Sequence, residues 1–268
     1  MKRASRSPAT LQTPERLSRP RLGALVAILL LATAAAAAEP TSQPALPRRL
    51  EYRVAWNGIP AAGATVDITH GERFGQPTLD VEAQARTNAF VDVFWTFRGT
   101  ARTTMLARDL KPLEFRYQRT MAGTPYLTWV DFDQRDNRAR SIYMRGTKKK
   151  ELEVDADNVF DPITAVFRAR LSGAGPGDVI RYRIFTGEAS YQVQLTVVGP
   201  DEIDVPAGHF RALRVTPEIW KITTTTEPDR RLRDATIWVA DDPLRTLLRI
   251  RSEVFVGAVT LDLVKVDA

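Results

Sequence analysis

The stretch that decides the fold is SYQVQLTVVGPDEIDVPAGHFRALRV, residues 190–215. Apolar and polar side chains alternate along most of it, Pro206, Ala207 and Gly208 interrupt the alternation, and the pattern then resumes. Successive side chains of a β-strand point to opposite faces, so this spacing predicts strands with one buried and one solvated face. The stretch therefore predicts two antiparallel strands joined by a turn.

The same two-residue period extends over most of the chain. Residues 50–69 predict a second hairpin, and its first strand has an apolar face formed by Leu50, Tyr52, Val54 and Trp56. Antiparallel sheets with one solvated face produce such alternation. Further strands are expected at residues 78–86, 97–106, 112–119, 125–133, 138–145, 149–154, 178–186, 190–198, 210–222, 235–240, 246–255 and 258–266.

Two segments depart from this period. Residues 161–171 predict a short amphipathic helix, because Asp161 suits the N-cap and Pro162 suits the first helical turn. The apolar face of this helix is expected to consist of Ile163, Val166, Phe167 and Leu171. Residues 88–96 fit either a short helix or a strand that is buried on both faces.

One helix within a long series of strands restricts the architecture. The apolar face of the helix needs a sheet to cover it, and a twisted antiparallel sheet with many strands curls. We therefore expect a mainly β protein with a single antiparallel open β-barrel or β-sandwich. The helix at about 161–171 is expected to pack inside it or at one end.

The first 38 residues have the composition of an export signal. Basic residues Arg16, Arg19 and Arg21 precede the apolar run LGALVAILLL, and a series of small residues ends at Ala38, where we expect cleavage. Retention as an anchor is the alternative, but the apolar run is shorter than the ~20 residues that cross a bilayer. We thus expect a periplasmic protein with a flexible, proline-rich linker at 39–48 and one β domain at 49–268.

The composition excludes several classes of function. The net charge is +6, but residues 1–38 hold six bases and one acid, which leaves +1 for the rest of the chain. This balance argues against a nucleic-acid partner, which requires a concentrated basic surface. The chain has no cysteine, which excludes disulfides, thiol catalysis and zinc–thiolate sites.

Few titratable residues suggest catalysis. His209 and His70 lie at turns, without a nucleophile or carboxylate at the spacing of a catalytic triad. Two carboxylate pairs could act as acid and base, although turns and strand ends explain them equally well: Asp131 with Asp133, and Asp241 with Asp242. We therefore predict a protein that is not an enzyme, with no catalytic residue, no metal and no cofactor.

Aromatic side chains are spread over most of the expected strands and the helix. An ordinary packed core explains them, but a curved sheet of this size can also leave an apolar cavity that binds a ligand. The candidate ligand-lining residues are Trp56, Phe97, Tyr117, Trp129, Phe167, Trp220 and Trp238. Residues 102–120 and 227–234 carry more arginine than turns require, which could form a patch for an acidic partner or lipid head groups.

The order of five segments resembles a known family. These segments are LEYRVAWNGIPAAGATVDI, FDPITAVFRARL, DEIDVPAGHFRALRV, TIWVADDPLRTLLRI and FVGAVTLDL. In this order the chain is similar to the bacterial exported proteins of domain-of-unknown-function family 3108. The resemblance implies an exported, mainly antiparallel β protein of Gram-negative bacteria with no established reaction. One departure, Leu247 where the family often has proline, leaves the register of that hairpin open.

These observations favour a non-enzymatic periplasmic protein that binds an apolar or amphipathic, lipid-like ligand. The alternative is a structural or partner-binding envelope protein with a filled core. A hydrolase that uses Asp131, Asp241 or His209 is the third hypothesis. The expected partners are a lipid or other apolar small molecule, or an envelope protein, with no nucleic acid and no stable transmembrane segment after signal cleavage.

Overall fold

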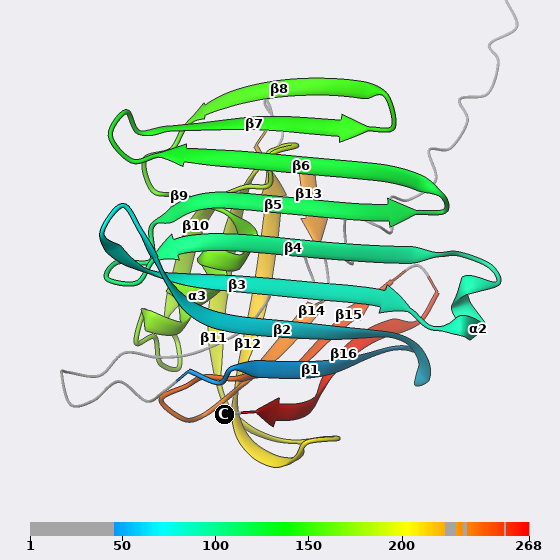
Figure 1. The fold of residues 1–268 in the computed structure, drawn as a ribbon. Coiled ribbons are helices and arrows are strands. Elements are labelled where there is room, and N and C mark those ends of the chain that lie inside the picture. The colour runs from blue at the N-terminus through cyan, green and yellow to red at the C-terminus, as the bar shows by residue number, and fades with distance from the viewer. Residues whose placement is uncertain (1–45, 223–228, 233–234, 255, 268) are drawn as a thin grey trace, which may run out of the picture.

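The computed structural model describes residues 46–222, 229–232, 235–254 and 256–267 (Figure 1). Side chains are described within these ranges except at 170, 171 and 229–232. The expected export signal at 1–38 lies outside the described residues, as do residues 39–45 of the expected linker. The backbone amide of Arg48 donates to the carbonyl of Asp267 at 2.9 Å, which joins the start of the described chain to its end.

From Arg49 to Asp155, the chain forms eight strands and one short helix. The strands are β1 (Arg49–Trp56), β2 (Ile59–Arg73), β3 (Gln76–Thr87), β4 (Phe97–Leu106), β5 (Pro112–Met121), β6 (Thr124–Asp133), β7 (Arg138–Arg145) and β8 (Lys148–Asp155). The short helix α2 (Ala89–Asp92) follows β3, so the helical interpretation of residues 88–96 is confirmed. It begins at Asn88, whose side chain accepts a hydrogen bond from the amide of Val91 at 2.9 Å.

The longer helix and the second half of the strands follow β8. A two-residue strand, β9 (Val159–Phe160), precedes helix α3 (Pro162–Leu171). The remaining strands are β10 (Val179–Phe185), β11 (Ser190–Val205), β12 (Gly208–Lys221), β13 (Asp229–Leu232), β14 (Ala235–Ala240), β15 (Leu247–Glu253) and β16 (Ala258–Asp267). None of the helices in the described ranges is both long and apolar enough to cross a membrane.

Sixteen strands of the described residues join into one barrel-like sheet. Its order is β8, β7, β6, β5, β4, β3, β2, β1, β16, β15, β14, β12, β11, β10 and β9, with β13 paired to β12. Every pair is antiparallel except β9 with β10. Figure 1 shows β1 to β8 as one layer, with β10 to β12 crossing behind it. The prediction of a mainly β, antiparallel fold is confirmed.

Two β-bulges shift the expected alternation. The register of β1 with β2 shifts between Val54 and Ala55, so Ala55 is buried and Trp56 is 49% exposed. The buried face of this strand therefore ends at Ala55, and the prediction that Trp56 belongs to the apolar face is wrong. In the hairpin whose register the sequence left open, Val239 pairs with Leu247, and a bulge lies between Trp238 and Val239.

Helix α3 is anchored at its first turn by Asp161, which has no exposed surface. Its carboxylate accepts hydrogen bonds from the amides of Ile163 at 2.9 Å and Thr164 at 3.0 Å, which confirms the predicted N-cap. The same carboxylate also accepts from the hydroxyls of Thr164 and of Thr103 on β4. Burial raises the pKa of Asp161, although these four hydrogen bonds oppose the shift.

The helix lies between the two layers of the sheet and belongs to the core. It contacts β4 in one layer and β9 and β10 in the other, and its side chains Ile163 and Phe167 are buried (Figure 1). One apolar cluster contains these side chains together with residues from β1 through β16. The largest side chains with less than 2% exposure are Phe97, Phe115, Phe185, Leu50, Met105, Leu247, Leu248 and Leu263.

Replacing Asp161 by alanine is expected to lower the free energy of unfolding by about 2 kcal/mol. The variant loses the N-cap and leaves the buried hydroxyl of Thr164 without this acceptor. Urea denaturation at neutral pH measures the loss. Asp157→Ala, an exposed residue of the preceding turn, is the matched control and is expected to change stability by less than about 0.5 kcal/mol. Equal effects of the two variants would contradict the anchoring role of Asp161.

Candidate functional site

Two rows of side chains cross the inner face of the sheet where β5, β6 and β7 lie side by side. Cross-strand pairing places Arg119 opposite Tyr126, and Tyr126 opposite Arg145. In the next row, Tyr117 lies opposite Thr128. Residues opposite each other in an antiparallel sheet point to the same face, so each row gathers side chains from several strands.

Arg119 is the centre of this arrangement, because it is a cation with only 8% exposure. Its guanidinium carbon lies 4.8 Å from the ring centroid of Tyr117 and 4.7 Å from that of Tyr126. Its Nη2 atom donates to Oε1 of Glu188 at 2.8 Å. Burial disfavours the charged guanidinium, but Glu188 and the tyrosine Tyr117 outweigh burial and raise the pKa of Arg119. The group is therefore a permanent buried cation.

The tight turn between β10 and β11 brings Glu188 to Arg119. Gly187 in this turn has φ of +78°, and an added Cβ would lie 2.3 Å from Cγ2 of Thr128. The hydroxyl of Ser141 on β7 donates to the carbonyl of Gly187 at 2.9 Å. Only glycine allows this close approach, so the turn covers β6 and β7 and holds Glu188 over β5. We call Tyr117, Arg119, Thr128 and Glu188 the Arg119 site.

Three buried polar atoms of the Arg119 site have no hydrogen-bond partner among the described residues: Nε of Arg119, Oη of Tyr117 and Oγ1 of Thr128. Burial raises the pKa of Tyr117 to about 12, and the nearby guanidinium of Arg119 opposes this shift. Each unpartnered buried group costs about 1–3 kcal/mol unless water or a ligand bonds to it. The site is therefore suited to a polar group from outside the chain.

Exposed cations continue both rows toward the edge of the sheet. Arg145 lies opposite Lys148, and Tyr143 lies opposite Lys150. We call Arg145, Lys148 and Lys150 the basic ledge; all three side chains are exposed. The ledge and Arg119 make this part of the inner face positive, so an approaching anion is attracted to it.

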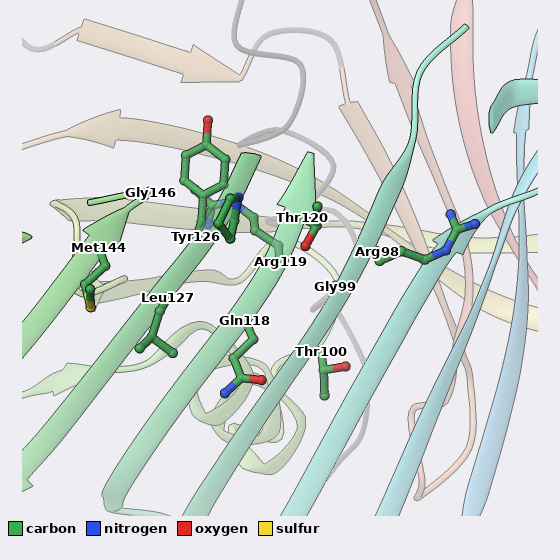
Figure 2. Close-up of a pocket in the computed structure, with 11 residues that line it drawn as sticks. Arg98, Gly99, Thr100, Gln118, Arg119, Thr120, Tyr126, Leu127, Met144 and Gly146 are labelled. Carbon is green, nitrogen blue, oxygen red and sulfur yellow. The ribbon is translucent and has the colours of Figure 1, made fainter. Parts of the chain in front are cut away.

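A groove of about 490 Å³ lies at the same end of β4 to β7, and Arg119 and Tyr126 contribute to its lining. Figure 2 shows a second row along this groove, formed by Thr100, Gln118, Leu127 and Met144. Cross-strand pairing joins these four residues, and they alternate with Arg119 and Tyr126 along their strands. Neighbouring residues of a strand point to opposite faces, so the side chains of this second row lie on the outer face of the sheet, behind the inner face that holds Arg119.

The seven aromatic residues that the sequence suggested as ligand-lining do not surround one space. Phe97 and Tyr117 lie together, because a Cβ on Gly99 would meet Cζ of Phe97 at 2.8 Å and Cε2 of Tyr117 at 3.5 Å. Phe167 is buried on α3. The other four are at least partly exposed and belong to separate strands: Trp56, Trp129, Trp220 and Trp238.

Two of these tryptophans have polar or charged partners instead of a cavity. Trp129 is 37% exposed, and the guanidinium carbon of Arg116 lies 4.0 Å from its ring centroid. Trp238 donates from Nε1 to Oδ2 of Asp201 at 3.0 Å. Tyr117 is therefore the member of the predicted set that belongs to the Arg119 site.

Most titratable residues considered for catalysis lie at turns and strand ends. The expectation that His70 lies at a turn is wrong, because His70 lies within β2, opposite Leu79 of β3. Nδ1 of His209 is 3.0 Å from Oδ1 of Asp204, and the histidine side chain is 58% exposed. Asp242 accepts from the amide of Arg245 at 2.7 Å, and Asp133 accepts from the amide of Arg135 at 2.9 Å. Across the described ranges, no three histidine, aspartate or glutamate side chains gather in a way that could hold a metal ion.

The sequence contained one signal for the Arg119 site. Residues 102–120 were identified as richer in arginine than turns require, and Arg119 is one of them. Its partner Glu188 is 69 positions away, and no local pattern predicts this contact. Within the second arginine-rich segment, 227–234, the structure describes the backbone of residues 229–232 and no side chain.

Comparison with known proteins identifies a family and a similar fold. The sequence profile of DUF3108, described as a protein of unknown function, matches residues 51–264 and confirms the resemblance seen in the sequence. The crystal structure of a β-barrel-like protein of domain of unknown function DUF1849 from Brucella abortus has a TM-score of 0.50 at 10% identity. That match covers 83% of this chain and 97% of the Brucella chain, and it supports the barrel-like fold.

Two further solved structures are more distant. A Bacteroides fragilis protein, described as exported and with a YmcC-like fold, has a TM-score of 0.35 at 11% identity, covering 83% of this chain and 98% of its own. A Parabacteroides distasonis protein described as a lipoprotein has a TM-score of 0.34 at 11% identity, covering 83% and 96%. No curated protein sequence matches the chain significantly.

Replacing Tyr117 by phenylalanine is expected to remove part of the alkaline instability of the protein. The folded-state pKa of about 12 exceeds the ordinary value of 10.0, so the stability that Tyr117 contributes is complete below pH 10 and is lost as the pH rises toward 12. Over this interval, the free energy of unfolding should fall by ~2 kcal/mol more in the wild type than in Tyr117→Phe. Urea denaturation between pH 9 and about 12 measures the difference. Parallel profiles for the two proteins would show that the hydroxyl is not buried.

Proposed function

We propose that this chain, which belongs to the DUF3108 family, is a non-enzymatic periplasmic protein that binds an amphipathic, lipid-like molecule with an anionic head group. Export is inferred from the signal-like composition of residues 1–38. The observation that carries ligand binding is the Arg119 site, where a buried cation adjoins unpartnered polar atoms. In this proposal the sheet is an open barrel with this site near its mouth.

The head group is assigned to the Arg119 site because of its charge and its free donors. An arginine presents N–H donors in a fixed planar arrangement that matches carboxylate and phosphate oxygens. Nε of Arg119 and the hydroxyls of Tyr117 and Thr128 could each donate to such oxygens. Glu188 occupies Nη2 and neutralises part of the charge, so it competes with the anion. The basic ledge offsets this competition at longer range.

The apolar part of the ligand is assigned to the inner face beside Arg119. Met121 follows Arg119 by two positions on β5, so its side chain points to the same face. It packs partly buried against the core, and Met adapts its shape to irregular apolar partners. The interior between the layers is occupied by large side chains such as Phe97 and Phe185. Binding at the end of the strands is therefore favoured over enclosure within the barrel.

A second candidate is a structural or partner-binding envelope protein with a filled core. The observation that favours it is the continuous apolar cluster from β1 to β16, which includes Phe97 and Phe167 among the predicted ligand-lining residues. In this case the unpartnered polar atoms of the Arg119 site would bind water. A hydrolase ranks third, because Asp131, Asp241 and His209 are bonded to neighbouring side chains at strand ends and turns.

Binding of 11-(dansylamino)undecanoate, a fluorescent anionic amphiphile, and of its methyl ester tests the ligand proposal. The acid is expected to bind more tightly than the uncharged ester. Arg119→Gln is expected to weaken binding of the acid about tenfold or more, because a charge-assisted hydrogen bond is lost. Glu188→Gln is expected to strengthen it several-fold, since it removes the competing carboxylate. Fluorescence titration of the purified protein gives the dissociation constants.

Arg135→Gln is the matched control, because it removes one exposed arginine from the turn between β6 and β7 and should leave the affinity for the acid unchanged. Thermal unfolding of each variant checks that the fold is retained. The opposite signs for Arg119→Gln and Glu188→Gln separate binding at this site from a general effect of net charge. Equal affinity of the acid and the ester, or no change in either variant, would favour the filled-core alternative.

A further inference from the structure

We propose that one end of the molecule docks on the surface of an anionic lipid bilayer through a rim of apolar side chains. This inference goes beyond the binding of a single ligand, because it concerns the surface on which the whole molecule rests. The apolar rim consists of Trp56, Ile59, Phe90, Val93, Phe94 and Val256. Figure 1 shows α2 and the turn from β1 to β2 at the same end of the sheet.

The rim is one continuous surface, although its residues come from three distant parts of the chain. The side chain of Asn88, at the start of α2, donates to the carbonyl of Pro60 in β2 at 2.6 Å. The side chain of Asn57, in the turn from β1 to β2, accepts from the amide of Ala258 at 2.8 Å. Trp56 donates from Nε1 to the carbonyl of Val256 at 2.8 Å. These bonds join α2, the first hairpin turn and the turn between β15 and β16.

The apolar side chains of α2 and of the two residues after it are largely exposed to solvent. Phe90, Val93 and Phe94 are 63%, 77% and 78% exposed, and no residue of the helix is buried. The rings of Phe90 and Phe94 pack edge to face with centroids 6.0 Å apart, so they form one protruding apolar tip. Exposed apolar groups gathered in one patch mark an interaction surface more often than scattered ones.

The shape of the rim fits a bilayer better than a protein partner. Its residues lie on strand ends, turns and a one-turn helix at the end of the sheet, and not on the flat face of the sheet. The backbone of β1 next to the rim is paired on both sides, with β2 and β16, so no free strand edge is available for a protein strand. Aromatic and aliphatic side chains on such projections are typical of segments that enter the bilayer interface.

The charges at this end complement anionic head groups. Arg86 is an exposed residue near the end of β3, lies opposite Arg98, and makes no ion pair with a described residue. Arg145 and Lys148 of the basic ledge lie at the same end of the sheet (Figure 1). The acidic residue of α2, Asp92, is already paired with Arg98 at 2.5 Å. Cations therefore dominate at this end of the sheet, and each cation near an anionic membrane adds to the attraction.

The absence of cysteine from the sequence allows a direct test with single labels. Phe94→Cys places an environment-sensitive nitrobenzoxadiazole label in the rim, and Phe74→Cys places it on a side chain that is 92% exposed in the turn between β2 and β3, at the other end of those strands. The full chain is mixed with vesicles of phosphatidylglycerol and phosphatidylcholine. We expect a blue-shifted, brighter emission and quenching by bilayer-embedded spin labels at position 94, and neither at position 74.

A second measurement does not depend on the label. In vesicle flotation, Phe90→Ser with Phe94→Ser is expected to weaken binding to the same vesicles about tenfold or more, because less apolar surface leaves water. Phe74→Ser is the matched control and should bind as the wild type does. Arg86→Glu is expected to weaken binding to phosphatidylglycerol vesicles several-fold.

Three results would overturn the proposal. The label at position 94 could stay in water while the protein floats with the vesicles. Both labels could respond equally, as expected if residues 1–45 alone held the protein on the bilayer. The Phe90→Ser and Phe94→Ser substitutions could leave the affinity unchanged while thermal unfolding shows an intact fold.

Discussion

The carboxylate of Asp161 is entirely buried, and its four hydrogen bonds run both to the first turn of α3 and to Thr103 of β4. A buried carboxylate is costly to desolvate, so it is retained only where several donors surround it. Here those donors come from the helix that it caps and from the sheet that the helix packs on. Because α3 also contacts β9 and β10, this junction links the two layers of the sheet into one core.

The position of α3 makes the two ends of the barrel-like sheet different. Near one end, Arg168 of α3 donates to the carbonyl of Asp109, in the turn after β4, at 2.7 Å. Toward the other end, the short turn that contains Gly187 and Glu188 reaches β5 and β7. A buried cation is left there beside unpartnered polar atoms. The proposed ligand site and the apolar rim both belong to this end.

The sequence predicted those features that depend on neighbouring residues. Nearly every strand was expected, because burial of one face imposes a two-residue period, and the N-cap at Asp161 was expected from Asp-Pro before an apolar helical face. The orientation of Trp56 was not expected from the sequence, because it depends on a bulge that appears only when β1 pairs with β2. The Arg119 site was also missed, since Arg119 meets Glu188 only after the sheet has folded over itself. Single-sequence patterns therefore gave the strands and the helix, while cross-strand register determined the candidate site.

Amide hydrogen exchange tests most directly whether Asp161 joins the helix to both layers. The amides of residues in the first two turns of α3 and those in the middle of β4 are expected to exchange with the same free energy of opening, equal to that of global unfolding. Exchange of the α3 amides at a distinctly lower free energy, while β4 stays protected, would contradict this account and show that the helix opens independently of the sheet.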